Sequence, residues 1–320
     1  MERPLLVILG PTGSGKSDLA LFLASEFPAE IVSCDSLQVF RSFDIGTAKV
    51  DHASRERVPH HLIDVADPGE TFTAGDYSRL ARAAVRDIAD RGKLPIVTGG
   101  TGFYLRALLE GLATAPARDE DLRTRLSQKE SRRPGALHRI LRRMDPGAAQ
   151  RIHANDKQKL IRAIEVTMRA RQPISEVHAI PPDPLRGFDV LKIGLNPSRS
   201  QLHDALNTRA EAMFVNGLLP EVNGLLASGL SGNEKPFESL GYKQALTVIR
   251  ESAALEDAIA STQLETRQYA KRQMTWFRRE NSVFWIDGFG RSSETRQQAL
   301  LSVRSWHEHF PHRLFTEKTS

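Results

Sequence analysis

Apolar residues along the chain occur either in continuous runs or at helically spaced positions, and the two kinds of block alternate. A continuous run such as PLLVILG at 4–10 is typical of a strand buried on both faces of a parallel sheet. Alternating strands and helices predict an α/β fold, with a parallel, doubly wound sheet flanked by helices. We expect strands at 4–10, 29–36, 94–100, 188–195 and 282–287, and helices at 17–27, 74–91, 102–108, 198–217, 219–228, 239–251 and 255–280.

This alternation is interrupted near residue 115. From there to about residue 184 the sequence has helical segments and turn signals but no convincing strand. The economical interpretation is an inserted all-helical domain at 118–186, carried by an α/β core that comprises 1–117 and 187–310. Residues 311–320 are expected to form a frayed tail.

The composition is that of an ordinary globular protein, with 320 residues of which 40% are hydrophobic and 26% charged. No apolar run approaches the ~18 residues of a membrane span, and the first residues lack the pattern of a signal peptide. The single cysteine, Cys34, excludes an intramolecular disulfide and fits a reducing compartment. We expect a cytosolic protein with no membrane partner, and a monomer.

Positive charge is concentrated in the middle of the chain. Residues 118–200 hold 18 Lys and Arg against 10 Asp and Glu, whereas the remainder is slightly acidic. Concentrated positive charge attracts a polyanion, most commonly a nucleic acid. An arginine-rich solvated helix surface would fit the charge equally well.

Residues 10–17, GPTGSGKS, match the P-loop pattern G-x-x-x-x-G-K-[ST] in full, between a strand and a helix. The glycines let the backbone curl so that its N–H groups face phosphate oxygens, and the following helix adds the positive end of its dipole. Lys16 supplies a point charge, and the hydroxyl of Ser17 can ligate Mg²⁺, the expected cofactor. A di- or triphosphate is therefore expected at Gly10, Pro11, Thr12, Gly13, Ser14, Gly15, Lys16 and Ser17.

The residues at the end of the strand at 94–100 help to distinguish a nucleoside triphosphate from another phosphate compound as the ligand. Nucleotidases and kinases with this loop place an aspartate at the end of a hydrophobic strand to hold Mg²⁺. Here the strand runs into TGGT at 98–101, and Asp64 follows an apolar run too short to favour that role. A kinase is therefore disfavoured, whereas a diphosphate leaving group needs the same loop without machinery for a γ-phosphate.

Several long segments resemble one family, the tRNA dimethylallyltransferases, also called tRNA isopentenyltransferases. The segments occur in the family's order and span most of the chain up to about residue 287. One departure is Phe40, where the family usually has tyrosine. The matching segments are GPTGSGKS at 10–17, SCDSLQVFRSFDIGTAK at 33–49, PHHLIDVADP at 59–68, PIVTGGTGFYLRAL at 95–108, DKQKLIRAIEV at 156–166, RAEAMFVNGLLPEV at 209–222, ESLGYKQ at 238–244 and TRQYAKRQMTWFRR at 266–279.

The resemblance implies transfer of a dimethylallyl group from dimethylallyl diphosphate to N6 of the adenosine 3′ of the tRNA anticodon. It implies that Asp35 is the general base and that Thr101 contacts the substrate. Lys16 and Arg209 would stabilise the departing diphosphate. On the residues alone, Asp35 also fits a turn, Thr101 a helix cap and Arg209 a surface salt bridge.

The resemblance also implies that the basic insertion holds the anticodon stem-loop while the target base is flipped into the enzyme. Trp276 and Phe277 suit base stacking, but they fit ordinary helix packing as well. The implied tRNA contacts are Asp35, Ser36, Leu37, Gln38, Thr101, Arg123, Gln158, Lys159, Leu160, Ile161, Arg162, Glu238, Ser239, Leu240, Gly241, Tyr242, Lys243, Lys271, Arg272, Gln273, Met274, Thr275, Trp276, Phe277 and Arg278.

Three other functions remain open at this point. One is a P-loop kinase of a small molecule or nucleoside, which the missing strand-end carboxylate disfavours. Another is an adenylate isopentenyltransferase, which would not need the long basic insertion. The third, a non-catalytic RNA-binding module, leaves the intact P-loop unexplained.

Overall fold

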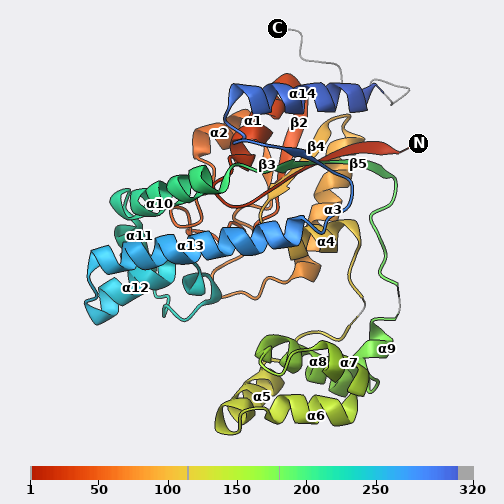
Figure 1. Ribbon diagram of the computed structural model, residues 1–320, viewed down its shortest axis with the longest axis vertical. Coiled ribbons are helices and arrows are strands. Elements are labelled where there is room, and N and C mark those ends of the chain that lie inside the picture. The colour runs from red at the N-terminus through yellow and green to blue at the C-terminus, as the bar shows by residue number, and fades with distance from the viewer. Residues whose placement is uncertain (1, 114, 180, 309–320) are drawn as a thin grey trace. The chain divides into compact units, whose positions relative to one another are not determined.

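The computed structural model describes residues 2–113, 115–179 and 181–308 (Figure 1). Contacts within the chain divide it into two compact units. The first comprises the residues up to Leu109 and those from Leu185 onward, and the second is Glu110–Pro184, against the 118–186 expected for the insertion. The tail expected at 311–320 lies outside the described residues.

A six-stranded parallel sheet forms the centre of the first unit, which confirms the predicted α/β fold. Its strand order is β3-β2-β4-β1-β5-β6. Because all strands are parallel, their carboxyl ends meet at one edge, which is where ligands bind in such sheets. The strands are β1 (Arg3–Leu9), β2 (Ala29–Ser33), β3 (His60–His61), β4 (Leu94–Gly99), β5 (Phe188–Leu195) and β6 (Val283–Ile286).

Helices cover both faces of the sheet (Figure 1). Side chains alternate along β1, so that Leu6 and Ile8 pack in one apolar cluster with α1 (Lys16–Glu26) and α14 (Ser293–His307). Leu5 and Val7 pack on the opposite face with α3 (Ala74–Asp90) and α4 (Gly102–Leu109). Helix α14 was not among the helices expected from the sequence, although its buried Thr295, Ala299 and Val303 recur every fourth residue.

The remaining helices of the first unit, apart from the short α2, lie beyond the carboxyl edge of the sheet and supply much of the site. The longest, α13, packs along α10, and Figure 1 shows it crossing below the sheet. None of the described helices is both long and apolar enough to cross a membrane. These elements are α2 (His52–Arg57), α10 (Arg199–Val215), α11 (Leu218–Ala227), the 3₁₀ turn η1 (Lys235–Glu238), α12 (Tyr242–Glu251) and α13 (Leu255–Phe277).

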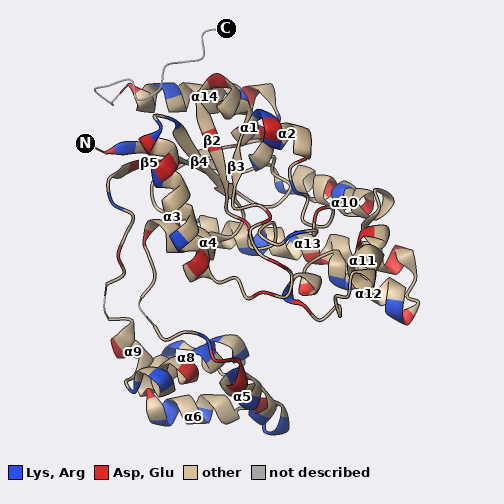
Figure 2. Ribbon diagram, turned by 180° about the vertical axis from the view of Figure 1, so that it is seen from behind, with Lys and Arg blue, Asp and Glu red and all other residues tan. Residues whose placement is uncertain are grey.

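The second unit has an apolar core of its own, with Leu137 and Leu141 packed among Leu160 and Ile164. No strand occurs in its described residues. Figure 2 shows Lys and Arg spread over α5, α6 and α8. Its helices are α5 (Glu120–Arg132), α6 (Ala136–Met144), α7 (Pro146–Arg151), α8 (Lys157–Ala170) and α9 (Ile174–Val177).

Candidate active site

The phosphate-binding loop connects the carboxyl end of β1 to the first turn of α1. Inside the loop, the Ser14 hydroxyl and the Lys16 ammonium both donate to the carbonyl oxygen of Pro11, each at 2.8 Å. Gly13 and Gly15 have φ angles of +77° and +84°, in the left-handed region that favours glycine. The loop therefore has the curled backbone that its sequence predicted.

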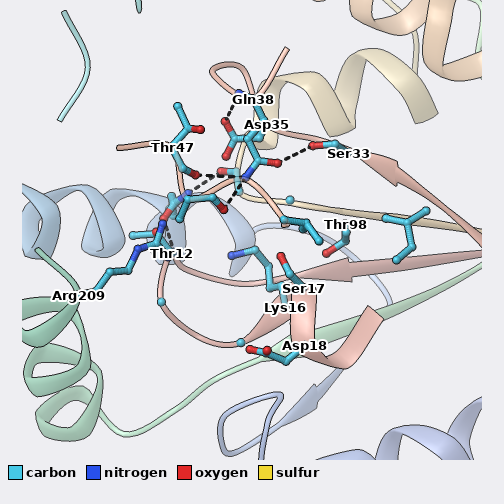
Figure 3. A pocket seen from close by; sticks show the side chains of 18 of the residues that line it. Thr12, Lys16, Ser17, Asp18, Ser33, Asp35, Gln38, Thr47, Thr98 and Arg209 are labelled. Atoms are coloured by element: carbon cyan, nitrogen blue, oxygen red, sulfur yellow. Dashed lines mark hydrogen bonds between the residues drawn. The ribbon is translucent and has the colours of Figure 1, made fainter. Parts of the chain in front are cut away.

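Two cationic side chains from different elements face one cavity beside this loop (Figure 3). Burial, and then the nearby Arg209, lower the pKa of Lys16 to about 8. Burial likewise lowers the pKa of Arg209, against the opposing influence of Asp35. Arg209 forms no ion pair among the described residues, so the surface salt bridge considered from sequence is not present. The cavity thus holds positive charge that an anion would stabilise.

Asp35 lies just beyond the carboxyl end of β2. Its Oδ1 accepts hydrogen bonds from the backbone N–H of Leu37 at 2.8 Å and of Gln38 at 3.4 Å. This is the turn geometry that the sequence allowed, and it leaves Oδ2 without a hydrogen-bond donor in the described chain. The carboxylate is therefore fixed by one oxygen while the other can accept a proton.

Thr101 and Gln38 support this turn. The Thr101 hydroxyl accepts from the N–H of Ser36 at 3.1 Å and lies 3.4 Å from the Ser36 hydroxyl. Gln38 uses its amide within the protein, with Nε2 donating to the carbonyl of Thr47 at 3.2 Å and Oε1 accepting from Ser33 at 3.1 Å. The structure therefore gives Thr101 a supporting contact to the turn beside Asp35, and its direct contact with the substrate stays a prediction.

Two cavities meet at Asp35. The first, of about 330 Å³, is lined by the phosphate-binding loop, Arg209 and the residues after β6. The second, of about 380 Å³, is lined by the turn after β2, η1 and the middle of α13. Both are lined by Thr12, Asp35, Thr47, Arg209 and Tyr269, so they adjoin and the carboxylate of Asp35 borders each.

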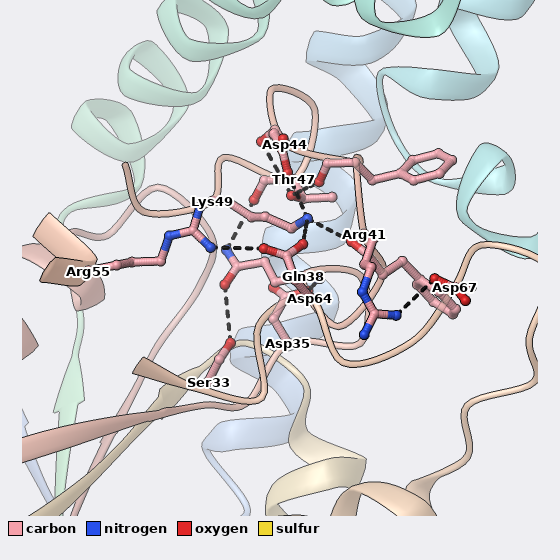
Figure 4. Close-up of polar contacts among 12 residues, drawn as sticks. Ser33, Asp35, Gln38, Arg41, Asp44, Thr47, Lys49, Arg55, Asp64 and Asp67 are labelled. Atoms are coloured by element: carbon pink, nitrogen blue, oxygen red, sulfur yellow. Dashed lines mark hydrogen bonds and ion pairs between the residues drawn. The ribbon is translucent and has the colours of Figure 1, made fainter. Parts of the chain in front are cut away.

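A buried lysine fixes the long loop between β2 and α2 (Figure 4). The side chain of Lys49 is 2% exposed and contacts Asp44 at 2.7 Å, Asp64 at 2.6 Å and the carbonyl of Phe40 at 2.6 Å. Arg55 donates to the second oxygen of Asp64 at 2.8 Å. Both oxygens of Asp64 are therefore occupied, which argues against a role in holding Mg²⁺.

Gln273 contacts the phosphate-binding loop instead of facing outward. Its Oε1 accepts from the N–H of Thr12 at 2.8 Å, and its Nε2 donates to the carbonyl of Gly100 at 2.8 Å. The residue is only 6% exposed. Gln273 therefore links α13 to the phosphate-binding loop and to the turn after β4, and its expected tRNA contact stays a prediction.

Several other residues expected to contact tRNA are buried in the chain. Phe277 is 1% exposed and belongs to the main core, which is the ordinary packing considered from sequence. Apolar side chains on these helices face inward because their spacing follows the helix period. Four side chains expected to contact RNA are core residues instead: Leu160, Ile161, Tyr242 and Phe277. Gly241, which precedes Tyr242, is also buried.

Two expected tRNA-binding arginines are engaged within the second unit. Glu165 is fully buried and accepts from Arg123 at 3.0 Å and from Arg162 at 2.7 Å. Arg123 is also largely covered, with 14% of its side chain exposed. By contrast, Lys159 is 73% exposed. Exposed cations near the start of α8 can reach a polyanion without breaking the ion pairs of Glu165.

Three residues of the site were missed by the sequence analysis. Tyr269 lines both cavities, and burial raises the pKa of its hydroxyl to about 12. Phe289 and Arg291, which follow β6, line the first cavity. The spacing of Tyr269 and Gln273, four residues apart on one helix, could have indicated that they share a face.

No cluster of three metal-ligating side chains occurs within the described part of the chain. The donors that line the first cavity beside the phosphate-binding loop include the Ser17 hydroxyl. Mg²⁺ usually keeps several waters and binds through phosphate oxygens with only one or two protein ligands. This sparse donor set therefore fits a metal that would be held mainly by a bound diphosphate.

Known proteins share both the sequence and the fold. The model of the family described as IPP transferase matches residues 38–280. The chain is 55% identical over 300 residues to the tRNA dimethylallyltransferase of Solibacter usitatus, covering 94% of this chain and 98% of that protein.

Solved structures of proteins named for the same activity share the fold of this chain. The full-length tRNA isopentenylpyrophosphate transferase of Bacillus halodurans aligns with a TM-score of 0.69 and 34% identity, over 97% of this chain and all of that one. A eukaryotic dimethylallyltransferase acting on tRNA aligns with a TM-score of 0.82 and 28% identity, over 97% of this chain and 80% of that one. The resemblance read from the sequence motifs is confirmed, and the chain belongs to the IPP transferase family.

Proposed function

We propose that this protein transfers a dimethylallyl group from dimethylallyl diphosphate to N6 of the adenosine 3′ of the anticodon in tRNA, releasing diphosphate. The observation that carries the proposal is the meeting of the two cavities at Asp35. One cavity offers cations for a diphosphate, and the other offers an open, mixed polar and apolar space for a base. The relatives named for action on tRNA support the same reaction.

At the donor end, the diphosphate is bound by the N–H groups of the phosphate-binding loop, by Lys16 and by Arg209. As the bond between the allylic carbon and the diphosphate oxygen breaks, negative charge accumulates on the departing group. Cations that are already positioned stabilise that charge without reorganisation of solvent. Ser17 would hold Mg²⁺ together with the diphosphate, and the metal would supply further neutralisation of its charge.

At the acceptor end, the adenine enters through the second cavity and presents its exocyclic amine to Asp35. The nitrogen lone pair forms the new bond to the allylic carbon, and the amine proton passes to Oδ2 of Asp35. Thr101 and the backbone of the turn keep the carboxylate in place. Catalysis on a base requires its removal from the stack, so the target base would leave the stacked loop and enter the cavity lined by α10 and α13.

The second unit is proposed to bind the anticodon stem-loop. Its residues, 110–184, carry 15 Lys and Arg against 10 Asp and Glu. An excess of Lys and Arg binds RNA phosphates without regard to base sequence, and it makes the affinity for RNA depend on salt concentration. We further propose that the enzyme acts in the cytoplasm as a monomer.

The kinase alternative is disfavoured by a specific observation. Both oxygens of Asp64, the strand-end metal ligand that the sequence analysis considered, are held by Lys49 and Arg55. The adenylate isopentenyltransferase alternative leaves the basic second unit without a role. Neither alternative gains support from the geometry.

The test is incubation with radiolabelled dimethylallyl diphosphate and either unmodified tRNA or AMP. We expect label in tRNA, on the adenosine 3′ of the anticodon, and none in AMP. Label in AMP alone would identify an adenylate isopentenyltransferase. Absence of label from both acceptors would refute the proposed reaction.

A further inference from the structure

The segment that follows β6, residues 288–292, lies directly against the phosphate-binding loop. The N–H of Gly290 donates to the carbonyl of Ser14 at 2.9 Å. A Cβ atom on Gly290 would lie 2.1 Å from the carbonyl oxygen of Gly15, and one on Gly15 would lie 2.9 Å from the nitrogen of Gly290. The two backbones therefore touch, and any side chain at either glycine would force them apart.

The residues on either side of Gly290 are oriented by this contact. Phe289 packs against the cluster of Leu202, Leu206 and Ala270 contributed by α10 and α13. The guanidinium carbon of Arg291 lies 5.2 Å from the centre of the Phe289 ring, within the range of a cation–π interaction. Both side chains line the cavity of the phosphate-binding loop. Arg291 is thus held at that cavity by the ring of Phe289, which itself packs against apolar side chains of α10 and α13.

The charge of Arg291 is available to a ligand. It is exposed, and it forms no ion pair with any residue in the described ranges. Of the charges deeper in the cavity, Lys16 and Arg209 are positive and Asp35 is negative. Asp18 also lines this cavity, and its negative charge offsets a further positive charge. A diphosphate ester carries several negative charges, so these groups alone leave it incompletely neutralised.

We propose that Arg291 binds the diphosphate of the prenyl donor at the mouth of the first cavity, as a third protein cation beside Lys16 and Arg209. The inference rests on the proposed function, because it takes the diphosphate to be that of dimethylallyl diphosphate. The guanidinium pairs with the oxygens of the distal phosphate, where its planar donors suit two oxygens at once. Arg291 does not approach the acceptor cavity and has no part in the proton transfer.

The test compares Arg291→Gln and Arg291→Lys with Arg304→Gln, a control away from the site. Arg304 is also an exposed arginine, on α14, where it lies 3.8 Å from Glu26, and it does not line the cavity. Steady-state prenylation of tRNA gives the KM of each substrate and kcat. Calorimetry with inorganic pyrophosphate, in the absence of tRNA, gives anion affinity independently of turnover.

For Arg291→Gln we expect KM for dimethylallyl diphosphate and Kd for pyrophosphate to rise about fivefold, the scale of a partly exposed charge pair. KM for tRNA and kcat stay as in the Arg304→Gln control, and Arg291→Lys recovers part of the loss. A merely structural role would lower kcat or thermal stability without this selective rise. An unchanged pyrophosphate affinity in Arg291→Gln would overturn the inference. If the unaltered enzyme never labels tRNA, the proposed function fails, while pyrophosphate binding still decides the role of Arg291.

Discussion

Replacing Gln273 tests whether α13 is tied to the phosphate-binding loop as the structure indicates. Gln273→Met keeps the length of the side chain but removes the acceptor for the Thr12 N–H and the donor to the Gly100 carbonyl. A buried polar group left without its partner costs about 1–3 kcal/mol. Thr12 borders a cavity that water can enter, so the cost of its unpaired N–H lies at the lower end of this range. We expect the free energy of unfolding to fall by about 2–3 kcal/mol in total.

The assay is urea denaturation of Gln273→Met beside Gln268→Met, an exposed glutamine on the same helix. The control is expected to change stability by less than about 0.5 kcal/mol. KM for dimethylallyl diphosphate should also rise in Gln273→Met, because Thr12 no longer has a fixed backbone position. Equal stabilities for the two variants, with an unchanged KM, would refute the reasoning.

Three further predictions follow from the same site. Asp35→Asn should lower kcat about 10²-fold or more, the usual contribution of a general base, with tRNA affinity measured by filter binding unchanged; an undiminished kcat would remove Asp35 from that role. Affinity for dimethylallyl diphosphate should fall as pH rises through about 8, because Lys16 loses its proton there in the free enzyme and the diphosphate favours the charged form. Calorimetry between pH 7 and pH 9 measures this, and Lys16→Met should bind weakly with a flatter pH dependence; an equally steep profile in that variant would assign the titration to another group. Lys49→Met should destabilise the protein by about 2 kcal/mol, less than the ~3–5 kcal/mol of a fully buried pair because its carboxylate partners are partly exposed, and urea denaturation without any loss would contradict the bracing role of Lys49.

Local chemistry made most of the sheet and the phosphate-binding loop predictable. The glycines of GPTGSGKS favour the curled backbone of the loop, and apolar runs such as PLLVILG are typical of strands buried on both faces of a parallel sheet. The resemblance then assigned Asp35 its place, and the Asx-type turn considered from the residues alone is also present. The turn uses Oδ1, which leaves Oδ2 available for the role of general base that the resemblance implies.

Contacts between distant segments were not predictable in this way. Gln273 reaches Thr12 across 261 positions of sequence, and the helical spacing that places it on one face with Tyr269 does not show what that face contacts. The hydrogen bond from Gly290 to Ser14 depends on how β6 enters the sheet beside β5. The pairing of Arg123 with Glu165 likewise appears only when α5 packs on α8, whereas Arg162 and Glu165 are three residues apart on α8 itself. The resemblance had implied that both arginines contact tRNA.

The central claim is that the departing group at the glycine-rich loop is diphosphate from an allylic donor. The most direct measurement follows pyrophosphate and N6-prenylated adenosine together, in a reaction of purified enzyme, unmodified tRNA and dimethylallyl diphosphate without ATP. The account predicts that the two products appear in equal amounts. Turnover that requires ATP and releases its terminal phosphate, or pyrophosphate release without prenylated tRNA, would contradict it.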